Sequence, residues 1–502
     1  MIATGPERTF SPAWPALAAA LEFPSLGFVD GQTRDARSGL SFSCANPATR
    51  EWLADVAAFQ QDDVDAAVQS ARSAFASACW SGTTPEDRKA RMLAFADRIV
   101  DRSEELALLD SLSMGKPAQV AYESDVAGAA SFIRWYAECV DKLYDEVVPS
   151  AAGSLVTATR EPLGVVGLIT PWNYPIEEAA IKLGPALAAG NSVILKPSEI
   201  SPFSAIRMGE LALDAGIPPG VLNIVPGIGE IAGRALALHP DVDCISFTGS
   251  TEVGKRLMRY SGESNLKRIW LECGGKSPNL VFEDCNDLDE AAAESARSVF
   301  RNQGQVCSAG SRLLVEDSIA DEFARKLVSA AEDYRPGDPL IASSRVGALA
   351  SPGQYRKVLD YIEIGLAEGA VLLLDGRDIV PPLPGYFLGP TIFTNVRPEM
   401  RIARDEIFGP VLCLMRFTDE AEAVRLANGD IHGLVASLWT SDLSRAHRVA
   451  RQLAAGSVTV NGADSQSAAA PFGGYKQSGI GREHSLHAFS LYTNVKTTWI
   501  HY

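Results

Sequence analysis

The sequence has 502 residues and a formal net charge of −17, from 45 lysine and arginine against 62 aspartate and glutamate residues. This length predicts about three domains and a core large enough to fold without disulfides or metal. Apolar residues make up 46% and charged residues 21%, which is typical of a globular enzyme and excludes a disordered or fibrous chain. The acidic balance argues against nucleic acid or an anionic membrane surface as a partner.

The cysteines and the N-terminal segment indicate the compartment. The eight cysteines are scattered and none forms a C-x-x-C pair, so we expect reduced thiols and no metal site. Glu7, Arg8 and early prolines interrupt any apolar segment of a signal peptide. No apolar run approaches the ~18 residues that a membrane span needs. We therefore expect a cytoplasmic protein without a membrane partner.

The first part of the chain predicts small hairpins followed by helices. Residues 27–59 mix glycine, proline and short β-like runs. From Val64 to Phe75 apolar residues recur at helical spacing, which predicts one buried helix face. Thr84 and Pro85 have the residue types of a helix N-cap and first helical position, so a second helix is expected there.

The segment 164–254 alternates short apolar runs with amphipathic runs. Strands are expected at 165–170, 192–196, 221–225 and 244–250, with helices at 176–190, 201–216, 229–240 and 251–262. Continuous apolar strands separated by helices predict a parallel sheet covered on both faces. The pattern is typical of a dinucleotide-binding domain, but the G-x-G-x-x-G fingerprint is absent, so the pattern alone leaves nucleotide binding open.

A second alternating region spans 287–466 and predicts another α/β unit. Two further β segments, near 144–159 and at the C-terminus, have no evident core of their own. Unpaired strands are usually covered by a partner. We therefore expect these segments to pair with another subunit.

Three residues have the chemistry of a catalytic site, and each also has a simpler interpretation. Cys307 lies in a polar, glycine-bearing loop after a helix, where a thiolate can be stabilised, although a free cysteine is also a common buried apolar residue. Glu272 follows an apolar strand and suits a general base, or an exposed strand end. Asn173 follows the strand at 165–170 and its amide can stabilise an oxyanion, or simply serve a turn.

Seven motifs occur in order along the chain: TPWNYP, LKPSE, FTGSTEVG, LECGGKSPN, NQGQVCSAGSR, EIFGPVL and PFGGYKQSGIGRE. Together they resemble the NAD(P)-dependent aldehyde dehydrogenase superfamily across essentially the whole chain. The segments LECGGKSPNLVF and RLLVEDSIADEF are most similar to the bacterial γ-glutamyl-aminobutyraldehyde and guanidinobutyraldehyde dehydrogenases.

The resemblance implies an α/β fold with three parts. A Rossmann-like NAD-binding domain would comprise residues 1–143 and 160–277, and an α/β catalytic domain residues 278–470. Residues 144–159 and 484–502 would form a small β oligomerisation element. A homodimer or homotetramer is expected.

The resemblance also assigns catalytic roles. Cys307 would attack the aldehyde, and the Asn173 side chain with the Cys307 N–H would hold the oxyanion. Glu272 would activate water to hydrolyse the thioester. Lys182 and Glu483 match positions thought to relay a proton from Glu272, although Lys182 also suits a solvated helix lysine.

For the cofactor, the resemblance and the strand ends favour NAD. A carboxylate at Glu199 would bind the ribose 2′-hydroxyl and repel a 2′-phosphate. Ser250 begins a helix whose N-terminus suits a phosphate. The expected cofactor-binding residues are Thr170, Pro171, Trp172, Lys196, Ser198, Glu199, Gly229, Phe247, Gly249, Ser250, Leu271, Gly274, Glu406 and Phe408.

For the substrate, Tyr174, Glu178 and Ile181 fall on one face of the helix expected after Pro175. By resemblance this face lines the substrate channel, where the Glu178 carboxylate favours an aminoaldehyde such as γ-glutamyl-aminobutyraldehyde or 4-aminobutyraldehyde. An ion pair of Glu178 with Lys182 is the ordinary alternative. Arg301 could neutralise Glu178, or it could bind the carboxylate of a polar or acidic semialdehyde. A broad-range aliphatic or aromatic aldehyde dehydrogenase also stays open. The other expected substrate-binding residues are Arg301, Val306, Ser308, Gln466 and Phe472.

Two rival functions remain. A CoA-acylating aldehyde dehydrogenase usually lacks the carboxylate that matches Glu272. A structural protein on the same fold would not need Cys307, Glu272 and Asn173 together.

Overall fold

The computed structural model describes residues 13–463 and 465–502. Residues 1–12, on which the expected absence of a signal peptide depends, lie outside the described residues. Within the described chain, no helix is both long enough and apolar enough to cross a lipid bilayer.

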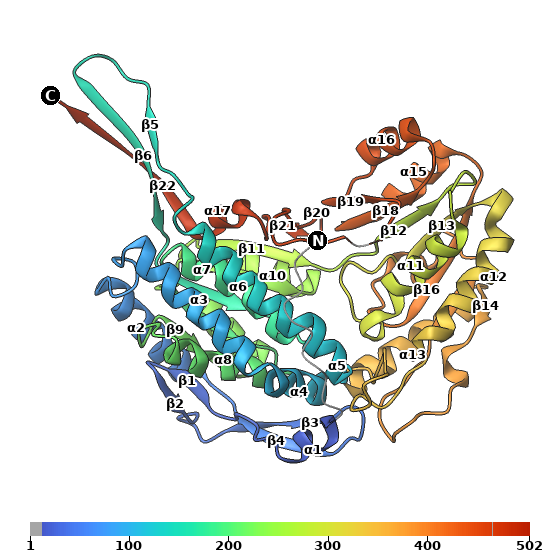
Figure 1. Cartoon of the computed structure of the whole chain (residues 1–502), viewed down its shortest axis with the longest axis horizontal. Helices are drawn as coiled ribbons and strands as arrows, with labels where there is room; N and C mark the ends of the chain where they lie inside the picture. The colour runs from blue at the N-terminus through green and yellow to red at the C-terminus, as the bar shows by residue number, and fades with distance from the viewer. Residues whose placement is uncertain (1–12, 464) are drawn as a thin grey trace.

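The first large sheet has eight strands and lies in the left half of Figure 1. Its order is β2-β1-β9-β8-β7-β10-β11-β21, and the five strands from β9 to β11 are parallel, which confirms the predicted parallel sheet. The chain places β8 and β9 on one side of β7 and then returns to place β10 and β11 on the other. Ligands bind at such a reversal, beyond the carboxyl ends of the strands. The bounds are β1 (Gly27–Val29), β2 (Gln32–Arg34), β7 (Val165–Ile169), β8 (Ser192–Lys196), β9 (Leu222–Ile224), β10 (Cys244–Gly249), β11 (Arg268–Cys273) and β21 (Gly479–Ile480).

Helices cover both faces of this sheet, because its central strands are apolar on both sides. Val166 and Leu168 pack with one set of helices, whereas Val165 and Ile169 pack with the other, as the period of two in a strand requires. The first set comprises α3 (Pro85–Asp101), α4 (Ser103–Met114), α6 (Ala127–Cys139), α7 (Pro175–Ala188) and α8 (Phe203–Asp214), and the second α2 (Gln61–Ala76), α9 (Arg234–Leu238) and α10 (Thr251–Glu263). Short segments nearby are α1 (Trp14–Ala19), β3 (Ser41–Ala45), β4 (Trp52–Ala57), α5 (Ala118–Val120), and the π-helical η1 (Ala121–Val126) and η2 (Gly229–Gly233).

The second large sheet lies in the right half of Figure 1 and has seven strands in the order β14-β15-β16-β13-β12-β18-β19. All neighbours from β15 to β19 are parallel. Its strands are β12 (Pro278–Val281), β13 (Arg312–Glu316), β14 (Val371–Leu374), β15 (Thr391–Thr394), β16 (Val411–Phe417), β18 (Val435–Trp439) and β19 (Ser457–Val460). Its helices are α11 (Leu288–Phe300), α12 (Ala320–Ala331), α13 (Pro352–Ala367), α14 (Arg401–Arg404), α15 (Glu420–Asn428) and α16 (Leu443–Gln452).

A three-stranded ribbon projects from the body in Figure 1, with the C-terminus at its tip. It consists of β5 (Glu146–Val148), β6 (Ser154–Pro162) and β22 (Thr493–His501), all antiparallel. The sequence-based boundary 484–502 is wrong at its start, because 484–492 contains the 3₁₀ turn η7 (Leu486–Ala488) and α17 (Phe489–Tyr492). Phe489 and Tyr492 are buried in the core that α6 and α7 share, which holds this segment on the body.

Candidate active site

Two adjoining cavities lie at the carboxyl ends of the first sheet's strands. The inner cavity, of about 200 Å³, is lined by Cys307, Glu272 and Asn173. The outer cavity, of about 310 Å³, is lined by residues that follow β7, β8 and β10. Both are lined by Pro171, Trp172, Thr248, Gly249 and Ser250, so they form one continuous site.

The loop that carries Cys307 has an unusual backbone. Asn302, Gln303 and Gly304 all have positive φ angles, of 49°, 57° and 70°. A Cβ at Gly304 would lie 2.1 Å from the carbonyl carbon of Gly409, so only glycine fits there. This turn brings Cys307, from the second sheet's domain, to the strand ends of the first sheet.

Asn173 and Asn302 hold this loop against the end of β7. The Asn173 side-chain Nδ2 donates to the Gln305 carbonyl at 2.9 Å. Asn302 Nδ2 donates in return to the Asn173 carbonyl at 3.0 Å, and also to the Gln305 carbonyl at 3.1 Å. The expected oxyanion donor is therefore fixed beside the nucleophile loop and has little freedom to rotate.

Cys307 is partly buried and packs against Leu434, Val435 and Phe472. Burial raises the pKa of its thiol well above the ordinary value, and the carboxyls of Glu272 and Glu178 raise it further. A thiol in these surroundings stays protonated at neutral pH, so it needs a base before it can attack.

Glu272 is the penultimate residue of β11 and is buried. Its Oε1 accepts no hydrogen bond from the described residues. Burial, and then the neighbouring Glu483 and Glu178, raise the pKa of its carboxyl well above the usual range, while Lys182 acts in the opposite direction. A carboxyl with a raised pKa beside a thiol has the properties of a general base or acid.

Lys182 is completely buried and forms an ion pair with Glu483. Its Nζ also lies 3.4 Å from the Ser246 hydroxyl. The alternative interpretation as a solvated helix lysine is therefore wrong. Lys182 is also not the ion-pair partner that the helix spacing offered to Glu178, because its ammonium turns toward Glu483.

The outer cavity collects most of the expected cofactor residues, namely Thr170, Pro171, Trp172, Lys196, Ser198, Glu199, Gly229, Phe247, Gly249 and Ser250. Lys196 Nζ lies 3.2 Å from a Glu199 carboxylate oxygen. Ser250 is the N-cap of α10, and its hydroxyl accepts a hydrogen bond from the Val253 N–H at 3.3 Å. The free N–H groups of such a helix start suit an anion.

Glu406, Phe408 and Gly274 line the inner cavity. The Phe408 ring packs edge-on against Trp172, with 5.3 Å between centroids. Phe408 has a φ of 61°, and Gln354 Nε2 donates to its carbonyl at 2.6 Å and to that of Ile407 at 3.1 Å. A Cβ at Gly274 would lie 2.1 Å from the Glu406 carboxylate, so this glycine makes room for it.

Of the expected substrate-binding residues, only Glu178 lines one of these cavities, and the others lie elsewhere. Glu178 lines the inner cavity, and burial raises the pKa of its carboxyl to about 7. Leu271 and the remaining substrate residues line neither cavity: Tyr174, Ile181, Arg301, Val306, Ser308, Gln466 and Phe472. Among these, Phe472 contacts Cys307, Ile181, Val306 and Ser308 are buried, and Gln466 lies in an exposed loop.

Four residues of the inner cavity were missed from the sequence: Thr248, Cys273, Gln354 and Lys357. The first two adjoin expected residues at the ends of β10 and β11, so the strand-end argument was sufficient to find them. Gln354 and Lys357 belong to α13 in the second domain, and no local pattern links that helix to the site.

This geometry gathers the Cys307 thiol, the Asn173 amide and the buried Glu272 carboxyl around one cavity, which continues into a second cavity at the strand ends of the first sheet. A profile described as aldehyde dehydrogenase family matches residues 34–498. The chain is 48% identical over 487 residues to the NADP/NAD-dependent aldehyde dehydrogenase PuuC of Escherichia coli (strain K12), covering 97% of this chain and 98% of that one. The chain belongs to the aldehyde dehydrogenase family.

Two solved structures of aldehyde dehydrogenases have the same fold as this chain. An indole-3-acetaldehyde dehydrogenase in complex with NAD+ superimposes with a TM-score of 0.97 at 50% identity, covering 98% of this chain and 100% of that one. A γ-glutamyl-γ-aminobutyraldehyde dehydrogenase from Burkholderia cenocepacia J2315 gives a TM-score of 0.96 at 50% identity, with the same coverage. The expected aldehyde dehydrogenase fold is confirmed.

Proposed function

We propose that this enzyme oxidises an aldehyde to a carboxylic acid with NAD, through a thiohemiacetal and a thioester on Cys307. The observation that carries the proposal is the single cavity that Cys307, Glu272 and Asn173 line together. A covalent intermediate divides aldehyde oxidation into two easier steps.

The residues act in order. Glu272 takes the thiol proton of Cys307, directly or through a water molecule, and the sulfur forms a bond to the aldehyde carbon. The Asn173 amide and the Cys307 N–H donate to the oxygen as it becomes negative. When bound, NAD supplies the hydride acceptor that converts the thiohemiacetal into a thioester. Glu272 releases the thiol proton by way of the buried Lys182–Glu483 pair and becomes a carboxylate again. It then removes a proton from the water that hydrolyses the thioester.

The chain's own residues fit this cofactor. The outer cavity combines a helix N-terminus at Ser250 with the Glu199 carboxylate, which suits a pyrophosphate and a ribose 2′-hydroxyl respectively. The Lys196 ammonium beside Glu199 offsets part of the repulsion that a 2′-phosphate would meet. We therefore propose a preference for NAD and some tolerance of NADP.

We propose water and not CoA as the acyl acceptor, since Glu272 lies in the same cavity as Cys307. NADH formation with an aldehyde, measured with and without CoA, tests this. Turnover that is independent of CoA is expected. A strict requirement for CoA would overturn hydrolysis, and no NADH with any aldehyde would overturn the reaction itself.

We propose that the substrate is an aminoaldehyde. Glu178 Oε2 is buried at the inner cavity and has no hydrogen-bond partner among the described residues. The charge of Lys182 and a hydrogen bond with Thr248 only partly oppose the rise that burial causes in the pKa of Glu178, so a cationic group would supply further counter-charge. The relative named for γ-glutamyl-γ-aminobutyraldehyde supports this class. A polar or acidic semialdehyde is the second candidate, because Arg301 lies six residues before Cys307.

The charge proposal is tested with 4-aminobutyraldehyde and butyraldehyde in the wild type and Glu178→Gln. The wild type should prefer the amine, and the variant should lose about 10-fold of that preference, as expected for one buried charge contact. The same ratio of kcat/KM in both proteins would exclude Glu178 from substrate recognition.

A further inference from the structure

Glu178, on α7, faces the two strands β10 and β11, and the register of these strands shows which residues it meets. The two strands are parallel neighbours, and Thr248 pairs with Glu272. Residues paired in register point to the same face of a sheet, so the Thr248 and Glu272 side chains share one face. Cys244 and Trp270, an even number of residues away along their strands, pack in the apolar core that contains α7. This face is therefore the one that α7 covers.

The side chains of α7 meet β10 at two levels. Lys182 Nζ lies 3.4 Å from the Ser246 hydroxyl. One turn earlier on α7, the Glu178 carboxyl meets the Thr248 hydroxyl, whose hydrogen bond lowers the pKa of that carboxyl. Four helical residues rise ~6 Å and two strand residues ~6.6 Å, so both contacts fit one straight alignment of α7 along β10.

This alignment places Glu178 between Glu272 and the buried ion pair. Glu272 shares its level with Thr248 and Glu178. Lys182 lies one level farther along β10 and pairs with Glu483. Glu178 and Glu272 also line the same cavity of about 200 Å³. One buried oxygen of each carboxyl, Oε2 of Glu178 and Oε1 of Glu272, has no hydrogen-bond partner among the described residues, so both can hold or accept a proton.

The electrostatic surroundings of Glu178 suit repeated proton exchange. Burial raises the pKa of its carboxyl from 4.5 to about 7, Glu483 raises it further, and Lys182 opposes the rise. A carboxyl with a pKa near the working pH can accept a proton and release it again at little cost in free energy. The pKa of Glu272 is raised well above its ordinary range, also mainly by burial, so it can pass a proton to Glu178.

We propose that Glu178 carries protons from Glu272 to the buried Lys182 ion pair. The inference rests on the proposed thioester mechanism and adds a step to it. Once Glu272 has taken the thiol proton of the nucleophile, the Thr248 hydroxyl accepts this proton and gives its own to the Glu178 carboxylate. Lys182 then passes a proton to Glu483 and takes the one from Glu178. One proton moves at each step, no electrons are transferred, and Glu272 is again a carboxylate that can activate water.

The first turnover with butyraldehyde tests this step, because this aldehyde has no amine for Glu178 to bind. Stopped-flow absorbance follows NADH and, through a pH indicator in weak buffer, the released protons. In Glu178→Gln the first NADH should form at the wild-type rate, and proton release should lag behind it. Hydrolysis then waits for Glu272, so kcat should fall by about 10²-fold, the lower end for one positioned proton-transfer group, while kcat/KM stays unchanged. Protons released together with NADH, or a wild-type kcat, would overturn the proposal.

Thr248 provides a second, independent pair of variants. Thr248→Val removes the hydroxyl between the two carboxyls at nearly constant size, so proton release should lag behind NADH as in Glu178→Gln. Thr248→Ser keeps the hydroxyl and should restore wild-type timing. Thr248 lines both cavities, and any effect on hydride transfer appears in the rate of NADH itself, separate from the lag. Prompt proton release in Thr248→Val would overturn the proposal even if Glu178→Gln does not fold.

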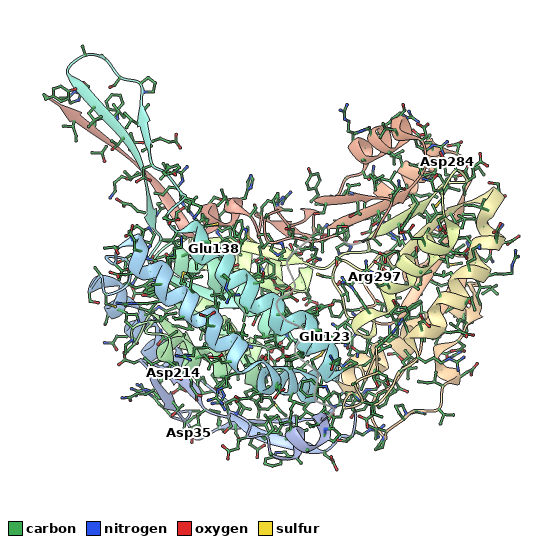
Figure 2. All side chains as sticks on the ribbon, viewed as in Figure 1. Asp35, Glu123, Glu138, Asp214, Asp284 and Arg297 are labelled. Carbon is green, nitrogen blue, oxygen red and sulfur yellow. The ribbon has the colours of Figure 1, made fainter. Side chains whose placement is uncertain are left out.

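Two other carboxyl variants are the controls. Glu177 precedes Glu178, but its Oε1 would lie 2.6 Å from a Cβ at Gly128, so it packs against α6 and lines neither cavity. Glu138 is exposed, and Figure 2 labels it at the end of α6 far from Glu123. Glu177→Gln and Glu138→Gln should both release protons with wild-type timing. A lag in either control would show that the effect does not depend on a carboxyl in the cavity, and would also overturn the proposal.

The outcomes separate this inference from the proposed function. The recognition test compares kcat/KM values, and a step after the first NADH does not enter them. If Glu178→Gln changes the preference for the amine but releases protons promptly, the proton carrier fails alone. If the wild type forms no NADH with any aldehyde, the proposed oxidation fails too.

Discussion

At the scale of single residues, the surroundings of Cys307, the proposed nucleophile, keep its thiol protonated. Its neighbours Glu272 and Glu178 are carboxyls, so they raise the thiol pKa instead of lowering it. A protonated thiol is protected from chance oxidation while the site waits for substrate. Proton removal must then be part of the reaction.

Cys307→Ala should lower kcat by at least about 10³-fold, the loss typical of removing a covalent nucleophile. NAD binding, measured by calorimetry, should persist, because the outer cavity is lined by other residues. Turnover above a small fraction of the wild-type rate would remove Cys307 from the mechanism.

Glu272→Gln should separate the two half-reactions. Acylation and the first NADH can form if another base or solvent takes the thiol proton, whereas hydrolysis lacks its base. Stopped-flow absorbance should show a burst of about one NADH per site and then slow turnover. A normal steady-state rate would mean that a different group activates the water.

Residues next to strand ends were predictable, and residues that arrive from elsewhere were not. Asn173 and Ser250 follow strands that the apolar pattern predicts, and Glu272 lies near the end of another. Glu177 had the same local pattern as Glu178, and only the space at Gly128 shows that the two carboxylates diverge. Gln354 and Lys357 line the inner cavity because α13 packs against the site. This packing produces no sequence pattern near the seven motifs, so the two residues could not be predicted.

At the scale of elements, the first turn of α7 carries two carboxyls, Glu177 and Glu178, whose pKa values are raised by burial. The pKa of Glu178 rises from 4.5 to about 7 and that of Glu177 from 4.5 to about 8. Because both values are raised in the folded state, their contribution to stability is complete below about pH 4.5 and is lost as pH rises toward 8.

The wild-type Tm should therefore fall between pH 5 and pH 8. The double variant Glu177→Gln/Glu178→Gln cannot ionise at these positions, so its decrease should be smaller by at least about 2 °C in scanning calorimetry. Parallel curves for the two proteins would show that other buried acids dominate the pH dependence. Glu138→Gln should follow the wild-type curve.

The segment before β22 shows a limit of sequence patterns at the element scale. Its final residues alternate as a strand does, which predicted β22, but 486–492 are short helical turns. These turns depend on the burial of Phe489 and Tyr492 against α6 and α7, contacts more than 300 residues distant in sequence. The local spacing of apolar residues cannot predict helical turns that depend on such distant contacts.

At the scale of the whole molecule, the ribbon of β5, β6 and β22 exposes large apolar side chains. Val147, Val495, Trp499 and Ile500 are among them, with Trp499 62% exposed. A projecting apolar ribbon with free strand edges is unfavourable in water unless it is covered. We propose that a second copy of this chain covers it.

Light scattering at micromolar concentration should give a homodimer or homotetramer of the 53.6 kDa chain. Val495→Lys/Trp499→Lys, which places charges on the exposed ribbon, should shift the mass toward the monomer. A wild-type mass near 54 kDa would exclude the proposed assembly.

The hydrogen bonds between Asn173, Asn302 and Gln305 join two domains whose apolar cores are separate. Each domain is stabilised by its own apolar core, whereas the proposed catalytic residues come from both domains. A separation of an ångström or two at this junction would leave every helix intact and still break the oxyanion site. Gentle heating or dilute urea should therefore abolish catalytic activity before circular dichroism shows any loss of secondary structure. The activity should return on cooling or dilution.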